Sequence, residues 1–125
     1  VSPSAQLGPG CYIAAGARVS TGAKLGPHSM VNLNATIGHD TKAGAHLVVH
    51  PGAAIGGNVR MGKRVLVGAN AFIGQGLRIG DDVQIDAMAQ VTRDLPPRHL
   101  ATSRTLRILP RVDMEREAAD HPWSV

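Results

Sequence analysis

Aliphatic residues recur at every sixth position of this chain, without interruption, from Val1 to Val91. A second register, four residues after each of these positions, holds small or apolar residues throughout. A period of six fits neither an amphipathic helix nor an alternating strand. It is typical of a hexapeptide β-helix, in which each hexad forms one short strand and one corner. The aliphatic register consists of Val1, Leu7, Ile13, Val19, Leu25, Val31, Ile37, Ala43, Val49, Ile55, Met61, Val67, Ile73, Ile79, Ile85 and Val91.

The sixteen hexads predict the size and limits of the fold. With three hexads in each coil of eighteen residues, as in known β-helices, they make a little over five coils. Neighbouring coils would be spaced like paired strands, roughly 4.8 Å apart. The pattern stops at the breaker in residues 93–97. We therefore predict an all-β parallel β-helix over residues 1–97 and a C-terminal cap over residues 98–125, with residues 113–119 as a candidate short helix.

The composition agrees with a narrow core and indicates which cellular compartment the protein occupies. The 125 residues contain one Phe, one Trp and one Tyr, and a core one side chain wide has no room for rings. The single cysteine, Cys11, falls in the small inward register, so we expect it to be buried and structural. A chain that cannot form an internal disulfide favours a reducing compartment. No signal peptide or long apolar run is present, so we expect a cytoplasmic protein without a membrane partner.

The strongest candidate for chemistry is a pair of side chains at one predicted corner. His39 and Asp40 lie in the outward half of their hexad, and Gly57 lies one coil further along. A histidine can act as a general base near neutral pH, and an adjacent carboxylate holds its tautomer. A glycine beside it offers an unhindered N–H to a developing oxyanion. On spacing alone, a solvated His–Asp corner pair is an equal alternative.

Residues 31–40, VNLNATIGHD, carry a resemblance that continues through residues 51–59 and 91–97. The Asn-x-x-Ala-x-Ile-x-His-Asp string within them is the most specific part. The chain resembles, over residues 1–97, the hexapeptide-repeat sugar O-/N-acyltransferases of the sialic acid O-acetyltransferase type, which include acetyltransferases of UDP-4-amino sugars. The resemblance implies a left-handed parallel β-helix that forms a homotrimer. It also implies active sites in clefts between subunits and acetyl-CoA, or another acyl-CoA, as cosubstrate.

The resemblance also implies roles for individual residues. Direct transfer would move the acyl group to an amine or hydroxyl of a small acceptor, an amino sugar or a nucleotide sugar. His50 is a further candidate for contact with substrate, because it stacks one coil above the position matched to an acceptor-site asparagine. The matched positions are His39 as base, Asp40 as its supporting acid, Gly57 as the amide facing the thioester oxygen, Asn32 near the acceptor, and Ala69 and Ala87 along the cofactor channel.

Three departures from the family pattern support a second class of function. Val48 stands where the family usually has a second histidine, and residues 101–105 replace its closing Gly-Asn-Pro-Ala-Arg. The family's small N-terminal α/β domain does not precede Val1, and we expect that it is missing from this chain. The alternative is a non-catalytic or partner-dependent β-helix module that lacks its acceptor-binding domain.

Two further functions receive less support from the sequence. His28 and His46 share one predicted column, and stacked imidazoles could bind the metal of a carbonic-anhydrase-like hydratase. Those enzymes have a different pattern of histidines, and the column continues with Arg64 and Asp82 without an evident third ligand. We therefore expect a surface ladder and no metal. The net charge of +4 and pI near 10 raise nucleic acid as a partner. The basic residues lack interleaved aromatics for base stacking, so we expect no nucleic acid, and a basic rim also suits a CoA enzyme.

Overall fold

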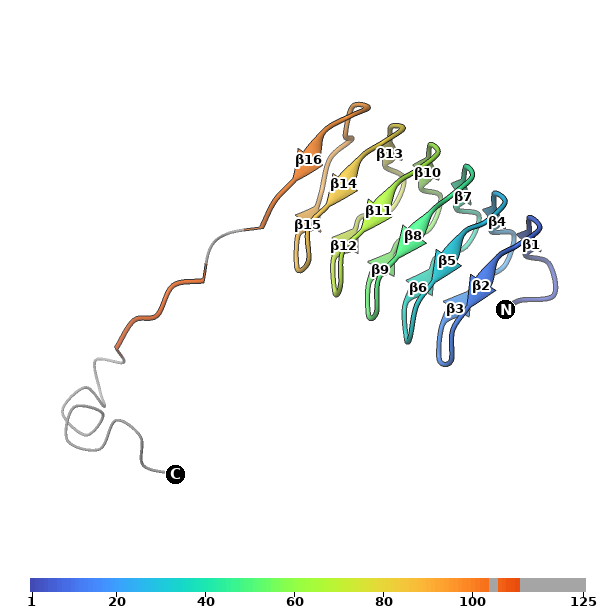
Figure 1. Cartoon of the computed structure of the whole chain (residues 1–125), viewed down its shortest axis with the longest axis horizontal. Coiled ribbons are helices and arrows are strands. Elements are labelled where there is room, and N and C mark those ends of the chain that lie inside the picture. The colour runs from blue at the N-terminus through green and yellow to red at the C-terminus, as the bar shows by residue number, and fades with distance from the viewer. Residues whose placement is uncertain (104–105, 111–125) are drawn as a thin grey trace, which may run out of the picture.

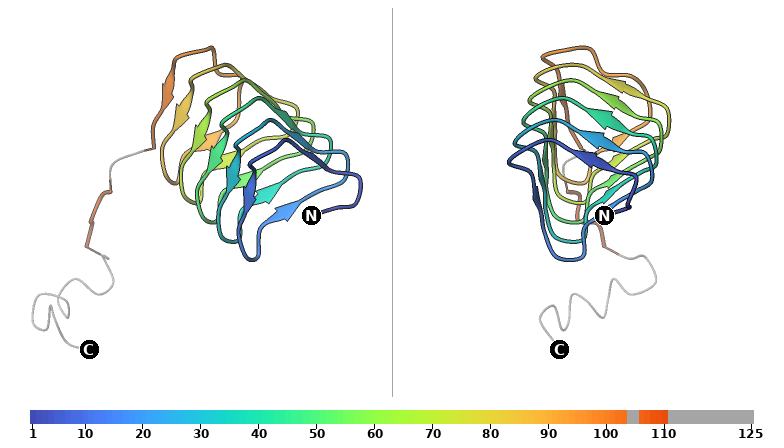
Figure 2. Two further views of the ribbon diagram at one scale, coloured as in Figure 1. Left: turned by 45° about the vertical axis from the view of Figure 1, so that its right-hand side comes forward. Right: turned by 90° about the vertical axis from the view of Figure 1, so that its right-hand side faces the viewer.

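The computed structural model describes residues 1–103 and 106–110. The chain winds as a prism with three parallel sheets on its three sides (Figures 1 and 2). Every strand is two residues long, and each is followed by a corner that leads to the next side. Sheet A contains β1 (Gln6–Leu7), β4 (Lys24–Leu25), β7 (Lys42–Ala43), β10 (Arg60–Met61) and β13 (Arg78–Ile79). Sheet B contains β2 (Tyr12–Ile13), β5 (Met30–Val31), β8 (Val48–Val49), β11 (Leu66–Val67), β14 (Gln84–Ile85) and β16 (Leu100–Ala101). Sheet C contains β3 (Arg18–Val19), β6 (Thr36–Ile37), β9 (Ala54–Ile55), β12 (Phe72–Ile73) and β15 (Gln90–Val91).

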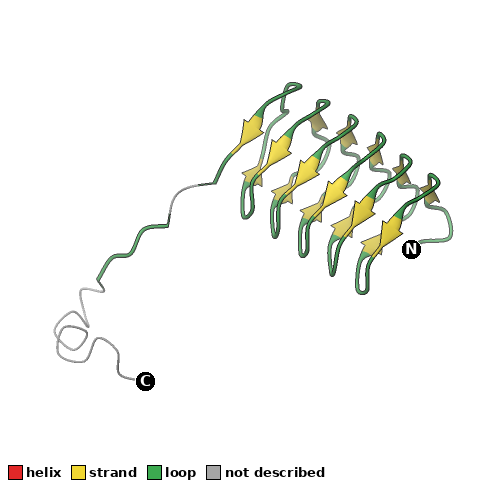
Figure 3. Ribbon diagram, in the orientation of Figure 1, coloured by secondary structure: helices red, strands yellow, loops and turns green. Residues whose placement is uncertain are grey.

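The register of the strands confirms the predicted all-β parallel β-helix, and the solenoid is consistent with the left-handed form that the resemblance implies. Val31 pairs with Val49 and Val49 with Val67, so partners in sheet B stand eighteen residues apart, which is three hexads. Among the described residues no helix is present (Figure 3). The expected helix at residues 113–119 lies outside the described residues. Within residues 1–103 and 106–110, no helix has the length and apolarity that a membrane crossing requires.

The core is a stack of aliphatic side chains from the second residue of each strand. Val31, Val49, Val67 and Ile85 are fully buried in one column, and each is covered by the coil above and the coil below. Most corners bend at one residue that adopts a left-handed backbone conformation; Asp40, for example, has φ 56°. Cys11 lies in the first coil, which is covered on one side only, so it is partly exposed rather than buried as predicted.

The last coil departs from the six-residue period. Val91 pairs with Ile73, and the next inward residue to bridge sheet A is Leu95, which lies opposite Ile79. The corner between them is therefore two residues shorter than a regular hexad. The period then resumes, because Ala101 of β16 pairs with Ile85. The division of the chain at residue 97 stays a prediction, and the structure adds that strand pairing continues to Ala101.

Candidate active site

His39 lies at the corner between sheets C and A. β6 ends at Ile37, and Gly38 turns the chain so that His39 stands on the outside of the prism. The carbonyl of His39 accepts a 2.8 Å hydrogen bond from the Asn58 N–H in the next coil. This bond holds the two corners in register, so the residue before Asn58 lies directly over the imidazole.

Asp40 orients the imidazole from the next position of the chain. His39 Nδ1 lies 3.2 Å from Asp40 Oδ2, and both side chains are more than half exposed. A carboxylate accepts but does not donate, so this hydrogen bond places the imidazole proton on Nδ1. The Nε2 lone pair is then free to accept a proton. This is the tautomer that a general base requires.

Gly57 packs against the His39 ring from one coil away. A Cβ at Gly57 would clash with Nε2 and would lie 2.7 Å from Cδ2, so a side chain here would displace the imidazole from this position. The Gly57 carbonyl accepts from the Gly76 N–H at 2.9 Å. The Gly57 N–H donates to no acceptor among the described residues. The corner therefore places a free backbone donor next to a histidine nitrogen that can accept a proton.

A buried hydroxyl lies immediately inside this corner. Thr41 is fully buried, and its Oγ1 donates to the Gly56 carbonyl at 2.7 Å. The same oxygen accepts from the Val59 N–H at 3.2 Å. In the sequence, Thr41 is only one member of the small inward register. The signal that could have singled it out is a hydroxyl in a column of aliphatic residues, one coil before the double glycine.

The other predicted site residues lie at a different corner, between sheets B and C. Asn32 follows β5, and its Nδ2 donates to the Val49 carbonyl at 3.0 Å. His50 follows β8 one coil above Asn32, and both are half-buried. Ala69 and Ala87 continue this corner after β11 and β14. Within one chain, sheet C separates this corner from His39.

The third corner, between sheets A and B, carries the predicted surface ladder. The rings of His28 and His46 stack with centroids 5.4 Å apart. Arg64 donates two hydrogen bonds to Asp82, of 2.6 and 2.8 Å. These bonds raise the pKa of Arg64 and lower the pKa of Asp82. Over residues 1–103 and 106–110, no three potential ligand side chains gather closely enough to hold a metal ion.

The sequence matches no protein-family model and no curated protein. Solved structures do match. The acetyltransferase domain of PglB from Neisseria gonorrhoeae is 31% identical over 78% of this chain and 51% of that one, with a TM-score of 0.68. A mutant of perosamine N-acetyltransferase from Caulobacter crescentus, in complex with CoA and GDP-perosamine, is 29% identical over 82% of this chain and 52% of that one, with a TM-score of 0.70.

A more distant neighbour belongs to a different acceptor class. The serine acetyltransferase of Neisseria gonorrhoeae, in complex with serine, is 27% identical over 82% of this chain and 38% of that one, with a TM-score of 0.52. The predicted likeness to hexapeptide-repeat sugar acyltransferases is thus confirmed by structural neighbours, and the chain spans about half the length of the sugar acetyltransferases. The PglB domain has also been solved with acetyl coenzyme A.

Proposed function

We propose that the chain is the acyl-transfer unit of an acyl-CoA-dependent acyltransferase, with His39 as general base. The observation that carries the proposal is the corner itself, where the His39 ring packs against Gly57 and the Gly57 N–H is free of any described acceptor. Neighbours solved with CoA or acetyl-CoA support the choice of cosubstrate. The corner thus brings together an orienting carboxylate, a ring nitrogen that can accept a proton and a free backbone donor.

The geometry supports a direct transfer. An acceptor amine or hydroxyl attacks the thioester carbonyl as His39 Nε2 removes its proton, and Asp40 stabilises the resulting imidazolium. The carbonyl oxygen becomes an oxyanion and accepts the Gly57 N–H. The intermediate then expels the CoA thiolate, which takes the proton back from His39. One acyl bond to nitrogen or oxygen forms, one bond to sulfur breaks, and free thiol is the second product.

A homotrimer would complete this site. Asn32, His50, Ala69 and Ala87 occupy a corner that sheet C separates from His39, so we infer that a neighbouring subunit presents its copy of that corner to His39. Sheet B offers an apolar surface for such an assembly. Its outward side chains include the exposed Tyr12 and Met30 and the half-buried Val48 and Leu66, and exposed apolar surface of this kind marks interaction sites.

For the acceptor, we infer an amino sugar or a nucleotide-linked amino sugar, as in the Caulobacter neighbour with GDP-perosamine. The test is thiol release from acetyl-CoA in the presence of a panel of nucleotide-linked amino sugars, free amino sugars, hydroxylated sugars and serine. We expect acceptor-dependent release with at least one amino sugar, and mass analysis of the product distinguishes N- from O-transfer. Release with serine alone would contradict the sugar assignment.

The alternative of a non-catalytic or partner-dependent module makes a different prediction for the same assay. Val48, at the position of the family's usual second histidine, lies on the face of sheet B and contributes no titratable group. If the chain binds acetyl-CoA but releases no thiol above background with any acceptor, the hypothesis of a non-catalytic or partner-dependent module is favoured. Release that begins only when a separate acceptor-binding protein is added would identify a partner-dependent unit.

A further inference from the structure

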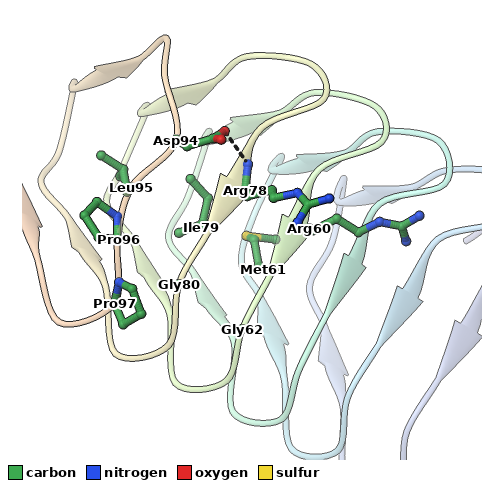
Figure 4. Close-up of a pocket in the computed structure, with 10 residues that line it drawn as sticks. All are labelled: Arg60, Met61, Gly62, Arg78, Ile79, Gly80, Asp94, Leu95, Pro96 and Pro97. Carbon is green, nitrogen blue, oxygen red and sulfur yellow. Dashed lines mark hydrogen bonds between the residues drawn. The ribbon is translucent and has the colours of Figure 1, made fainter.

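An open groove of about 840 Å³ lies on sheet A beside β10 and β13 (Figure 4). The segment that follows the shortened last corner, where Leu95 bridges Ile79, borders it. Arg60 and Arg78 line one side and project from neighbouring strands. Leu95, Pro96 and Pro97 form an apolar wall, and Met61, Gly62, Ile79, Gly80 and Asp94 complete the lining.

The two arginines end a longer column of cations. Each strand of sheet A from β4 to β13 begins with an exposed basic residue, and neighbouring strands pair these residues directly: Lys24, Lys42, Arg60 and Arg78. Like charges opposite one another on paired strands are destabilising. Of the two ion pairs in the described residues, neither involves this column. The column is therefore a favourable surface for an anionic ligand.

The groove adds shape to this charge. Asp94, its single acidic residue, directs Oδ1 to the Arg78 backbone N–H at 2.8 Å, so one carboxylate oxygen is already hydrogen-bonded. Arginine matches phosphate oxygens with two parallel hydrogen bonds. Leu95, Pro96 and Pro97 provide an apolar surface on which a planar or apolar group attached to the phosphate could pack. The combination suits an organic phosphate better than a free inorganic ion.

We propose that the groove at Arg60 and Arg78 binds the diphosphate of a nucleotide-bearing ligand. The proposal rests on the proposed acyl transfer, in which either the coenzyme or a nucleotide-linked acceptor supplies such a diphosphate. Lys42 connects the groove to the active corner, because it follows His39 by three residues and lies on β7 beside Arg60. A ligand anchored at the two arginines can therefore extend along the cation column toward His39.

The test is titration calorimetry of the whole chain with two probes, uridine diphosphate and coenzyme A, at low and at high salt. Arg60→Ala/Arg78→Ala is expected to weaken at least one probe by about tenfold or more, because two charge-assisted contacts are lost. The matched control is Arg18→Ala, an exposed arginine at the equivalent strand position on sheet C, and it should bind both probes within about twofold of wild type. Binding should also weaken with salt.

The two probes distinguish the source of the phosphate. Loss confined to uridine diphosphate identifies the acceptor, and loss confined to coenzyme A identifies the cosubstrate. Unchanged binding of both probes to the double variant overturns the proposal, as does an equal loss in the Arg18 control. His39→Ala should bind both probes like wild type, so a failure of the proposed chemistry is seen in turnover and a failure of the groove is seen in binding.

A second observation, at Thr41, carries an independent inference about the oxyanion donor. At several other corners, including the one a coil earlier, the carbonyl that follows the strand accepts directly from the N–H three residues later, as Gly38 does from Thr41 at 3.4 Å and Gly68 from Ala71 at 3.1 Å. At the corner of residues 56–59 the Thr41 hydroxyl stands between the two groups and bonds to both. The Gly56 carbonyl therefore points to an interior hydroxyl.

We infer that Thr41 is a positioning residue for the Gly57 N–H. The Gly56 carbonyl and the Gly57 N–H belong to one trans peptide, so they point in opposite directions. A carbonyl fixed inward by Thr41 fixes the N–H outward, on the side of His39. The hydroxyl contacts neither the imidazole nor a reacting atom, and it acts only through this peptide.

Thr41→Val tests this role, with Thr41→Ser as the rescuing variant. The valine variant is expected to lose about tenfold or more in kcat while the KM for acetyl-CoA stays within about twofold, because the donor acts in the transition state. Serine keeps the hydroxyl and should retain most of the rate. The matched control is Ser29→Ala. Ser29 Oγ donates to the Gly26 carbonyl at 2.8 Å, but the next residue is Pro27, which has no N–H.

Thermal unfolding of all three variants separates stability from positioning. Both Thr41→Val and Ser29→Ala should lower Tm, and only Thr41→Val should lower kcat. If the two variants lose stability and rate in the same proportion, or if Thr41→Ser is as slow as Thr41→Val, the positioning role is refuted.

Discussion

His39→Ala is expected to reduce acyl transfer by about 10³-fold, because it removes the base that takes the acceptor proton. The imidazole stands on an exposed corner and contributes nothing to the core, so the variant should fold and bind acetyl-CoA like wild type. The measurement is kcat for thiol release with the best acceptor of the panel, together with the coenzyme affinity of each protein.

The matched control for this prediction is His28→Ala. His28 is also an exposed corner histidine, but its neighbours are His46 and Gly10 rather than the Gly56–Gly57 peptide. We expect it to keep the wild-type rate within about twofold, as surface substitutions usually do. If the His39 variant has the same kcat as the His28 variant, His39 is not the general base.

The second large effect is expected from Gly57→Ala. An alanine Cβ would lie 2.7 Å from His39 Cδ2, a distance that side chains do not tolerate, so the imidazole must leave its position beside the amide. The backbone N–H remains in this variant, and what is lost is a general base aligned beside it, which contributes about 10²- to 10⁴-fold to the rate. We expect a loss of this size, with Tm little changed, because the displaced ring can turn into solvent.

Gly74→Ala provides the control for Gly57→Ala. Gly74 lies one coil beyond Gly56 at the same corner, and an added Cβ there would meet its nearest neighbour, the Val91 carbonyl, at 3.4 Å. That is an ordinary contact, so the variant should retain both rate and stability. If Gly57→Ala is as active as Gly74→Ala, the close packing of Gly57 on His39 makes no contribution to catalysis.

Most of the fold could be predicted from the sequence because a β-helix depends on one local rule. Each aliphatic residue of the six-residue repeat packs on the residue at the equivalent position of the next coil, as Val31 does on Val49. The coil length therefore determines every strand pairing. The shortened last corner could not be predicted in this way. The last corner is two residues shorter than the others, so the six-residue repeat is out of phase after it. Residues 93–97 therefore look like the end of the β-helix, although strand pairing resumes at β16.

The candidate site was predictable to the extent that it depends on register. His39 and Gly57 stand eighteen residues apart, so the coil length alone places them together. The direction of a peptide does not follow from register, and the role of Thr41 became apparent only from its two hydrogen bonds. The groove at Arg60 and Arg78 likewise depends on how the last coil closes.

The most direct measurement is a crystal structure of the chain with coenzyme A bound. We expect the coenzyme thiol to lie within about 3–3.5 Å of His39 Nε2, on the side where the Gly57 N–H is exposed. A coenzyme whose thiol lies away from every copy of His39 in the crystal would contradict this expectation.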